Sequence, residues 1–235
     1  MTLADTHVRH DHREVSGVKF SLDGKLIYVS CLSGALVILK VNHPSNKLEV
    51  LKTINCQKDP GEIYSLAVDE NHLLTGHTLT TTSVMIWNIQ GEEVLQDYTM
   101  GENSSDSIIW NLFLAYPLAL VCRDNETLDI FHLESKSCLK SLRHESKVLN
   151  AILHKNIIIV GCQYGLLVFW HLPTALEANP VVLDINHSSC LQILNEHSGA
   201  ISHIHVDKDE LITDDYDGVV IIRNLRSHSE IKKIF

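Results

Sequence analysis

The sequence predicts an all-β fold in which a unit of four antiparallel strands occurs about five times. The first observation is a recurring pattern, apolar-x-x-apolar-x-apolar, whose copies begin at Val15, Ile63, Ile109, Val148 and Ile201. The second is that two more apolar runs and one mixed polar segment follow each copy. The third is the near absence of the apolar periodicity that marks a helix. Short strands that return with a period of about 40–50 residues predict a repeat fold.

Each unit contains four candidate strands in the same order, and the first carries the recurring pattern. The second is rich in Val, Ile and Leu and lies at residues 26–30, 73–75, 118–122, 157–160 and 211–213. The third, also apolar, lies at residues 36–39, 84–87, 128–131, 167–170 and 220–222. The fourth mixes polar and apolar residues, as an outer strand with one wet face does, and lies at residues 48–54, 93–98, 138–142, 190–194 and 230–235. Gly34, Gly165 and Gly218 stand where a tight turn needs positive φ.

A single sheet of this size cannot bury both of its faces. Sheets packed radially around an axis can, and this arrangement is the β-propeller. We therefore expect a propeller over residues 12–235, preceded by a lead segment or stray outer strand at residues 1–11. The expected blades cover residues 12–58, 59–104, 105–143, 144–196 and 197–235. An immunoglobulin-like sandwich is the alternative, but it does not account for a pattern that returns five times.

The last unit resembles a WD40 repeat. Such a repeat has a His four residues before a β-branched position, and later an Asp-Gly pair and a closing segment that ends in Trp-Asp. Here His197 stands four residues before Ile201, and Asp217 precedes a glycine and an apolar run. The closing segments of the second and fourth units contain Trp87 and Trp170. The resemblance covers nearly the whole chain and implies a WD40-type β-propeller.

In the WD40 family a His, a Ser or Thr, an Asp and a Trp form a buried hydrogen-bond chain within a blade. The resemblance implies this structural role for His197, Thr213, Asp217 and His144. This hydrogen-bond network is expected to be incomplete here, because Arg223 stands at the Trp position of the last unit. The Asp position of the other units holds Ser33, Thr81, Asn125 and Tyr164. A half-satisfied buried network costs stability, so the sequence is identified as a divergent member of the family.

In its sequence pattern the last unit most resembles the propellers of F-box/WD proteins, which present substrates to ubiquitin ligases. No F-box helices precede the repeats in this sequence. WD40 propellers usually close with six to eight blades, whereas five units are found here. We therefore expect a five-blade array cut from, or descended from, a larger ring, with an open edge through which it could associate.

The composition narrows the range of partners and compartments. The chain has 19 Lys and Arg against 29 Asp and Glu, a formal net charge of −10, which argues against nucleic acid and against an anionic membrane surface. The longest apolar stretch, residues 112–122, is too short to span a membrane. The N-terminal residues lack a secretory pattern, and the 6 cysteines form no CxxC pair. We expect an intracellular protein of the cytoplasm or nucleus with free thiols.

The sequence contains no recognisable catalytic or cofactor-binding motif. We therefore expect no catalytic residues, no cofactor and no metal. The chain has 15 histidines, and three of them form an HxxHxH segment at His7, His10 and His12. No fourth ligand with fixed spacing accompanies them. Cysteines recur near the end of the second strand in three units, and this recurrence favours packing over catalysis.

Three large side chains occupy the same place in successive units, directly after the first apolar position: Tyr64, Trp110 and Leu149. The resemblance places this position near the mouth of the central channel, on the face that most often binds peptides. Three charged residues stand just before the apolar position: Glu14, Glu62 and Lys147. Aromatic residues ringed by charges are typical of protein interfaces. The alternative is that Trp110 is buried under the preceding loop, residues 101–106, and both interpretations are open.

The sequence therefore predicts a non-catalytic scaffold or adaptor that binds proteins or peptides within a multiprotein complex. One alternative is the substrate-recognition propeller of a ubiquitin ligase. Less favoured is a subunit of an RNA-processing or trafficking complex, and least favoured is a propeller enzyme that acts through channel carboxylates. Inner-face Asp or Glu residues at matching positions of several units would support the enzyme, and we find no such set.

Overall fold

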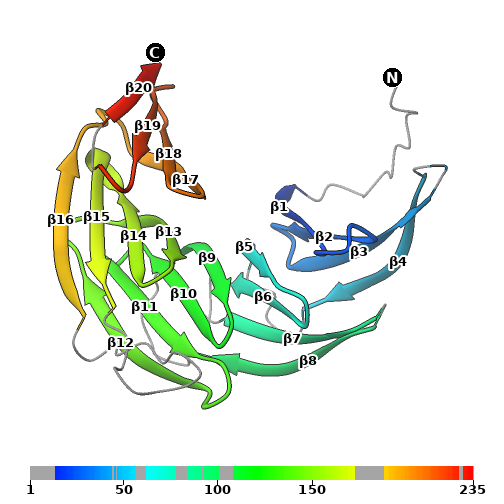
Figure 1. The fold of residues 1–235 in the computed structure, drawn as a ribbon. Helices are drawn as coiled ribbons and strands as arrows, with labels where there is room; N and C mark the ends of the chain where they lie inside the picture. The colour runs from blue at the N-terminus through cyan, green and yellow to red at the C-terminus, as the bar shows by residue number, and fades with distance from the viewer. Residues whose placement is uncertain are drawn as a thin grey trace. The chain divides into compact units, whose positions relative to one another are not determined.

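The computed structural model contains five four-stranded antiparallel sheets, and the strands of each sheet lie side by side in chain order (Figure 1). It describes residues 14–43, 45, 47–56, 62–77, 84–91, 93–100, 108–172, 188–227 and 230–234. The expected lead segment, residues 1–11, lies outside the described residues. The chain divides into two compact units, Met1–Ile109 and Trp110–Phe235.

The first unit holds two sheets. The first sheet consists of β1 (Val15–Phe20), β2 (Leu26–Cys31), β3 (Ala35–Asn42) and β4 (Lys47–Asn55). The second sheet consists of β5 (Ile63–Val68), β6 (His72–His77), β7 (Val84–Gln90) and β8 (Glu93–Met100). In the first sheet β2 and β3 are the most buried strands, whereas β1 and β4 are mostly exposed. In the second sheet β6 is the most buried of the strands β5, β6 and β7.

The second unit holds three sheets. The third sheet consists of β9 (Ile109–Ala115), β10 (Leu118–Arg123), β11 (Thr127–His132) and β12 (Ser137–Arg143). The fourth consists of β13 (Val148–His154), β14 (Ile157–Cys162), β15 (Leu166–His171) and β16 (Ser189–Asn195). A short 3-10 turn, η1 (Gln163–Gly165), joins β14 to β15. The fifth consists of β17 (Ile201–Asp207), β18 (Glu210–Asp215), β19 (Val220–Asn224) and β20 (Glu230–Ile234).

The predicted fold class is confirmed: the described chain is all-β and forms five four-stranded antiparallel sheets of the propeller-blade type. The first strand of each sheet begins at the residue where the recurring pattern begins: Val15, Ile63, Ile109, Val148 and Ile201. In β5, β9, β13 and β17 the first two apolar positions of the pattern are buried in the core, whereas in β1 all three positions are exposed, with Val15 at 59%, Val18 at 48% and Phe20 at 60%.

A β-bulge lies at the start of the first strand in four of the sheets. In β5, Ile63 pairs with His77 and Ser65 pairs with Gly76, so Tyr64 is the extra residue that the bulge inserts. The same shift inserts Ser16 in β1, Leu149 in β13 and Ser202 in β17. A bulge increases the local twist and re-aims the side chain of the inserted residue. The position that follows the first apolar residue is therefore displaced from the regular ladder.

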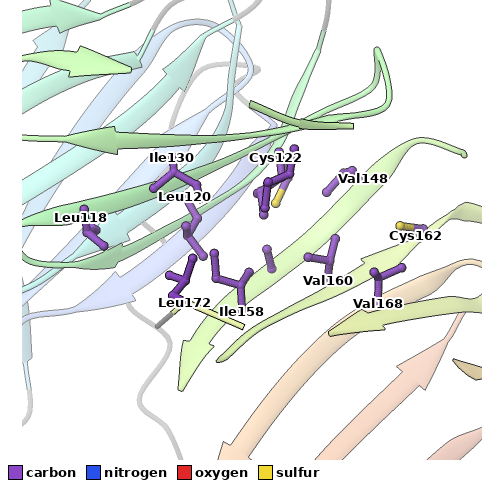
Figure 2. Packing of buried hydrophobic residues seen from close by; sticks show 13 residues of the cluster. Leu118, Leu120, Cys122, Ile130, Val148, Ile158, Val160, Cys162, Val168 and Leu172 are labelled. Atoms are coloured by element: carbon purple, nitrogen blue, oxygen red, sulfur yellow. The ribbon is translucent and has the colours of Figure 1, made fainter. Parts of the chain in front are cut away.

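Buried apolar side chains of neighbouring sheets pack together within each unit. In the first unit, one cluster joins the first and second sheets through Tyr28, Leu36, Ile38, Ile63, Leu66 and Leu73. In the second unit, a cluster joins the third and fourth sheets (Figure 2), including Leu120, Cys122, Ile130, Val148, Ile158 and Val160. Gly161 lies where the fourth and fifth sheets meet. A Cβ atom there would lie 2.5 Å from Cγ2 of Ile201, so the close approach of these sheets requires glycine.

Candidate functional site

A buried hydrogen-bond network lies in the fifth sheet and centres on His197. Nδ1 of His197 lies 3.0 Å from a carboxylate oxygen of Asp215, and Nε2 lies 2.8 Å from the hydroxyl of Thr213. The side chains of His197 and Asp215 are 2% and 0% exposed. Because an ionised carboxylate only accepts hydrogen bonds, Nδ1 of His197 carries a proton and donates it to Asp215. The network joins the segment before β17 to β18.

Asp215 also fixes the turn between β18 and β19. Its carboxylate accepts hydrogen bonds from the backbone N–H groups of Asp217 at 3.0 Å and Val219 at 2.9 Å. Burial raises the pKa of the Asp215 carboxyl, but the hydrogen bonds from Val219 and His197 outweigh this effect and hold the pKa below its usual range. The carboxylate is therefore ionised at neutral pH.

The sequence assignment of Asp217 to this network is wrong, and Asp215 takes that place. Asp217 is exposed at the tip of the turn, where it accepts a hydrogen bond of 3.2 Å from the hydroxyl of Ser198. The pairing register explains the difference: Asp215 pairs with Ile201 at the buried end of β18, whereas Asp217 lies beyond the end of the strand. The assignments of His197 and Thr213 agree with the observed contacts.

A second network, which the sequence reasoning missed, lies in the second sheet. The indole N–H of Trp87 donates to the hydroxyl of Thr75 at 3.0 Å, and that hydroxyl lies 2.7 Å from Nε2 of His77. All three residues are buried. Here the His lies at the end of β6 instead of in the segment before the sheet. A sequence signal does exist, because Thr75 precedes His77 by two residues, as Thr213 precedes Asp215.

The remaining sheets of the second unit carry different polar contacts. In the fourth sheet, the indole N–H of Trp170 donates to Nε2 of His144 at 3.1 Å, which gives His144 the structural contact expected of it. Burial lowers the pKa of His144, so its ring is neutral and can accept this bond. In the third sheet, Arg123 contacts Asp129 at 2.6 Å in the buried interior. At the Trp position of the fifth sheet, Arg223 pairs with Glu196.

The predicted partner-binding residues of the first unit lie around the start of β5. Tyr64 and Glu62 are half-buried, and Glu14 is exposed. A hydrogen bond to Glu62, desolvation, and the charges of Glu62 and Glu14 raise the pKa of the Tyr64 hydroxyl. These three side chains therefore form one acidic group with an aromatic member, and we call it the Tyr64 group.

The predicted partner-binding residues of the second unit lie at the starts of β9 and β13. Trp110 and Leu149 are half-buried, and the ammonium group of Lys147 lies 3.8 Å from the carboxylate of Asp124 in the turn after β10. We call Trp110, Lys147 and Leu149 the Trp110 group. Because the two groups belong to different units, their union in one patch stays a prediction. The loop expected to cover Trp110, residues 101–106, lies outside the described residues.

The described residues contain no group of three or more His, Cys, Asp or Glu side chains that could hold a metal ion. The HxxHxH segment at His7, His10 and His12 lies outside them. Burial raises the pKa of the Cys56 and Cys162 thiols to about 12, so neither is a thiolate at neutral pH and neither is poised as a nucleophile. No helix long and apolar enough to cross a membrane occurs in the described ranges.

Comparisons with known proteins bear on the fold alone. No family model and no curated protein matches the chain. Among solved structures, the computationally designed Ika8 protein is similar, with a TM-score of 0.71 and 15% sequence identity. The match covers 94% of this chain and 61% of the Ika8 chain, so this chain spans less than two thirds of that protein's length. At this level of identity the likeness establishes a common fold, and it agrees with the five-sheet architecture.

Proposed function

We propose that this chain is a divergent WD40-type β-propeller protein without catalytic activity, which binds proteins or peptides as a scaffold within a complex. The observation that carries the proposal is the recurrence of one polar site at the same register. Trp87, Trp170 and Arg223 occupy equivalent positions in the third strands of their sheets. Their pairing partners in the second strands are equivalent as well: Leu73, Ile158 and Leu211. Trp87 donates to Thr75 as the WD40 resemblance implies, whereas Trp170 donates to His144 and Arg223 pairs with Glu196, so the shared feature is a polar contact made from one register position.

These networks support a binding role because they stiffen the sheets on which the candidate residues are displayed. His197 and His144 each join a segment that precedes a first strand to the body of its sheet. Binding residues are commonly carried at the ends of a rigid scaffold. Tyr64 and Leu149 are inserted by bulges at those ends, and bulges are frequent beside functional sites.

The two candidate groups differ in charge. The Tyr64 group contains two carboxylates, whereas the Trp110 group contains an ammonium group that is half-exposed beside Asp124. The aromatic rings and Leu149 supply apolar contact area, and truncation of Trp or Tyr at the centre of an interface costs about 2–4 kcal/mol. A partner that buries Trp110 should therefore bind at least about 30-fold more weakly to a Trp110→Ala variant.

The experiment is a quantitative affinity purification of the tagged chain from cells, with mass spectrometry of the bound proteins. Trp110→Ala and Leu149→Ser should lose the same set of proteins. Trp110→Phe, which keeps an aromatic ring, should retain most of it. Lys208→Ala, in the turn at the opposite end of β17, is the control and should retain all of it.

Each variant is first shown to be folded by circular dichroism and by its melting temperature. If Trp110→Ala keeps the bound proteins and Lys208→Ala loses them, the partners bind at the strand ends that carry Lys208, and the Trp110 group is not the binding site. If no variant changes the set, the Trp110 group is part of the packing only, and the proposed binding site is refuted.

A further inference from the structure

The first unit contains a pocket at the strand ends that lie opposite to the Tyr64 group. Its volume is about 620 Å³, within the range of ligand sites in proteins. Three turns and the strand ends beside them form the walls: the β1–β2 turn, the β5–β6 turn and the β7–β8 turn. The lining residues are Ser21, Leu22, Asp23, Lys25, Leu26, Tyr28, Asp69, Glu70, Ile89 and Gly91.

Tyr28 is the most deeply buried residue of the lining and carries a hydroxyl. Tyr28 is 0% exposed, and among the described residues its hydroxyl has no hydrogen-bond partner. Burial and the charge of Asp23, another residue of the lining, raise the pKa of Tyr28. A buried hydroxyl without a partner costs free energy, and a ligand that reaches it would remove that cost.

The charges of the lining favour a cation. Hydrogen bonds from Ser21 and Lys25 lower the pKa of Asp23 to about 2, so it is ionised, and its carboxylate pairs with the Lys25 ammonium group at 3.1 Å. Asp69 lies 3.2 Å from Nδ1 of His72. Glu70 is an exposed carboxylate in the same wall. The lining itself contains three carboxylates and one ammonium group, which give it a net negative charge.

The apolar part of the lining suits a long side chain. Leu26 and Ile89 flank the pocket, and Leu22 is 75% exposed at its mouth. The methylene stem of a basic side chain packs along such surfaces while its charged end seeks polar groups. A guanidinium has five donors in a planar fork, so it can bond a carboxylate and a hydroxyl together.

We propose that this pocket binds the arginine side chain of a peptide segment of a protein partner, with the guanidinium hydrogen-bonded to the Tyr28 hydroxyl and attracted by Glu70 and Asp69. The site does not depend on the Tyr64 and Trp110 groups, because Tyr64 lies at the start of β5 and Asp69 follows its end. Failure of the proposed function at one end therefore leaves this inference open to its own test.

The test is a fluorescence anisotropy titration of the full chain with the labelled peptide acetyl-Gly-Ser-Arg-Ser-Gly-amide. The comparison peptide has citrulline in place of arginine, which keeps the shape and removes the charge. We expect the citrulline peptide to bind at least tenfold more weakly, since a hydrogen bond to a charged group is worth about a factor of ten or more. Raising the NaCl concentration should weaken binding of the arginine peptide.

Variants separate the roles of the two key residues. Tyr28→Phe removes only the hydroxyl, so it should lower the affinity for the arginine peptide about tenfold. The melting temperature should stay unchanged or increase. Glu70→Gln should lower the affinity for the arginine peptide about threefold or more. Glu210→Gln removes another exposed carboxylate, from β18 in the other unit, and should leave the affinity for the arginine peptide unchanged.

Several results would overturn the proposal. They are equal affinity for the citrulline peptide, undiminished binding by Tyr28→Phe, and no binding of the arginine peptide at millimolar concentration. If free arginine amide binds as tightly as the peptide, the pocket serves a small cationic molecule and the peptide assignment fails. If CaCl2 raises the melting temperature in the wild type and not in Glu70→Gln, the pocket is a cation site instead.

Discussion

Replacement of Asp215 by Ala is expected to destabilise the fold strongly. The change leaves Nδ1–H of His197 and the backbone N–H groups of Asp217 and Val219 without the carboxylate that accepts their bonds. Removing one partner of a buried charged group costs about 3–5 kcal/mol. For a chain of this size each kcal/mol shifts the melting temperature by about 2–4 °C, so a decrease of roughly 6–20 °C is expected.

The matched control is Asp217→Ala, which removes the same atoms from an exposed side chain two residues away. It should cost less than about 0.5 kcal/mol. Both variants can be compared by thermal melting and urea denaturation at pH 7. If Asp217→Ala is the more destabilised variant, the register of β18 and the network built on it are wrong.

The Asp215 carboxylate should also make the free energy of unfolding depend on pH, in a direction that its pKa determines. The pKa of Asp215 lies below its usual value of 3.8 in the folded protein. Its ionised form therefore stabilises the fold fully well above pH 3.8, and this contribution is lost as the pH falls toward the folded-state pKa. The difference in unfolding free energy between the wild type and Asp215→Asn should shrink below pH 3.8. A difference that grows with acidity would refute the assigned contacts.

The remaining predictions concern packing and the thiols. Trp87→Phe removes the indole N–H that Thr75 accepts and should lower the unfolding free energy by about 1–3 kcal/mol in urea denaturation; an unchanged value would place the indole outside the network. A thiol reagent at pH 8 should label two of the six cysteines quickly in the native protein, the exposed Cys138 and Cys190, and fast labelling of any of the other four would contradict the described burial. EDTA should leave the melting temperature unchanged; a decrease that zinc restores would assign a metal to the chain.

The first strands could be predicted because a bulge changes the spacing between their first two apolar residues. In a regular strand the residues that face one side are spaced by two. The residue inserted after Ile63 shifts this spacing, so that Ile63, Leu66 and the partly buried Val68 belong to one cluster while Tyr64 is displaced. The apolar-x-x-apolar-x-apolar pattern therefore records both the strand and its bulge, and it is visible without any structure.

The polar network could be predicted only in part. His197 and Thr213 were recognisable from their spacing, but two aspartates lie close together after Thr213. The choice between Asp215 and Asp217 depends on where β18 ends, and the pairing with Ile201 decides it. The network of Trp87 was missed because its His lies inside a strand. The pocket at Tyr28 could not be predicted, because it needs three turns that are distant in the sequence.

Site-specific photo-crosslinking tests the central claim most directly. A benzophenone amino acid is placed at position 149, the bulge residue of β13, or at position 208, in the turn at the other end of β17. After irradiation in cells, mass spectrometry identifies the proteins joined to each position. Our account predicts specific protein adducts from position 149 that are absent from position 208. Adducts from position 208 together with none from position 149 would contradict it.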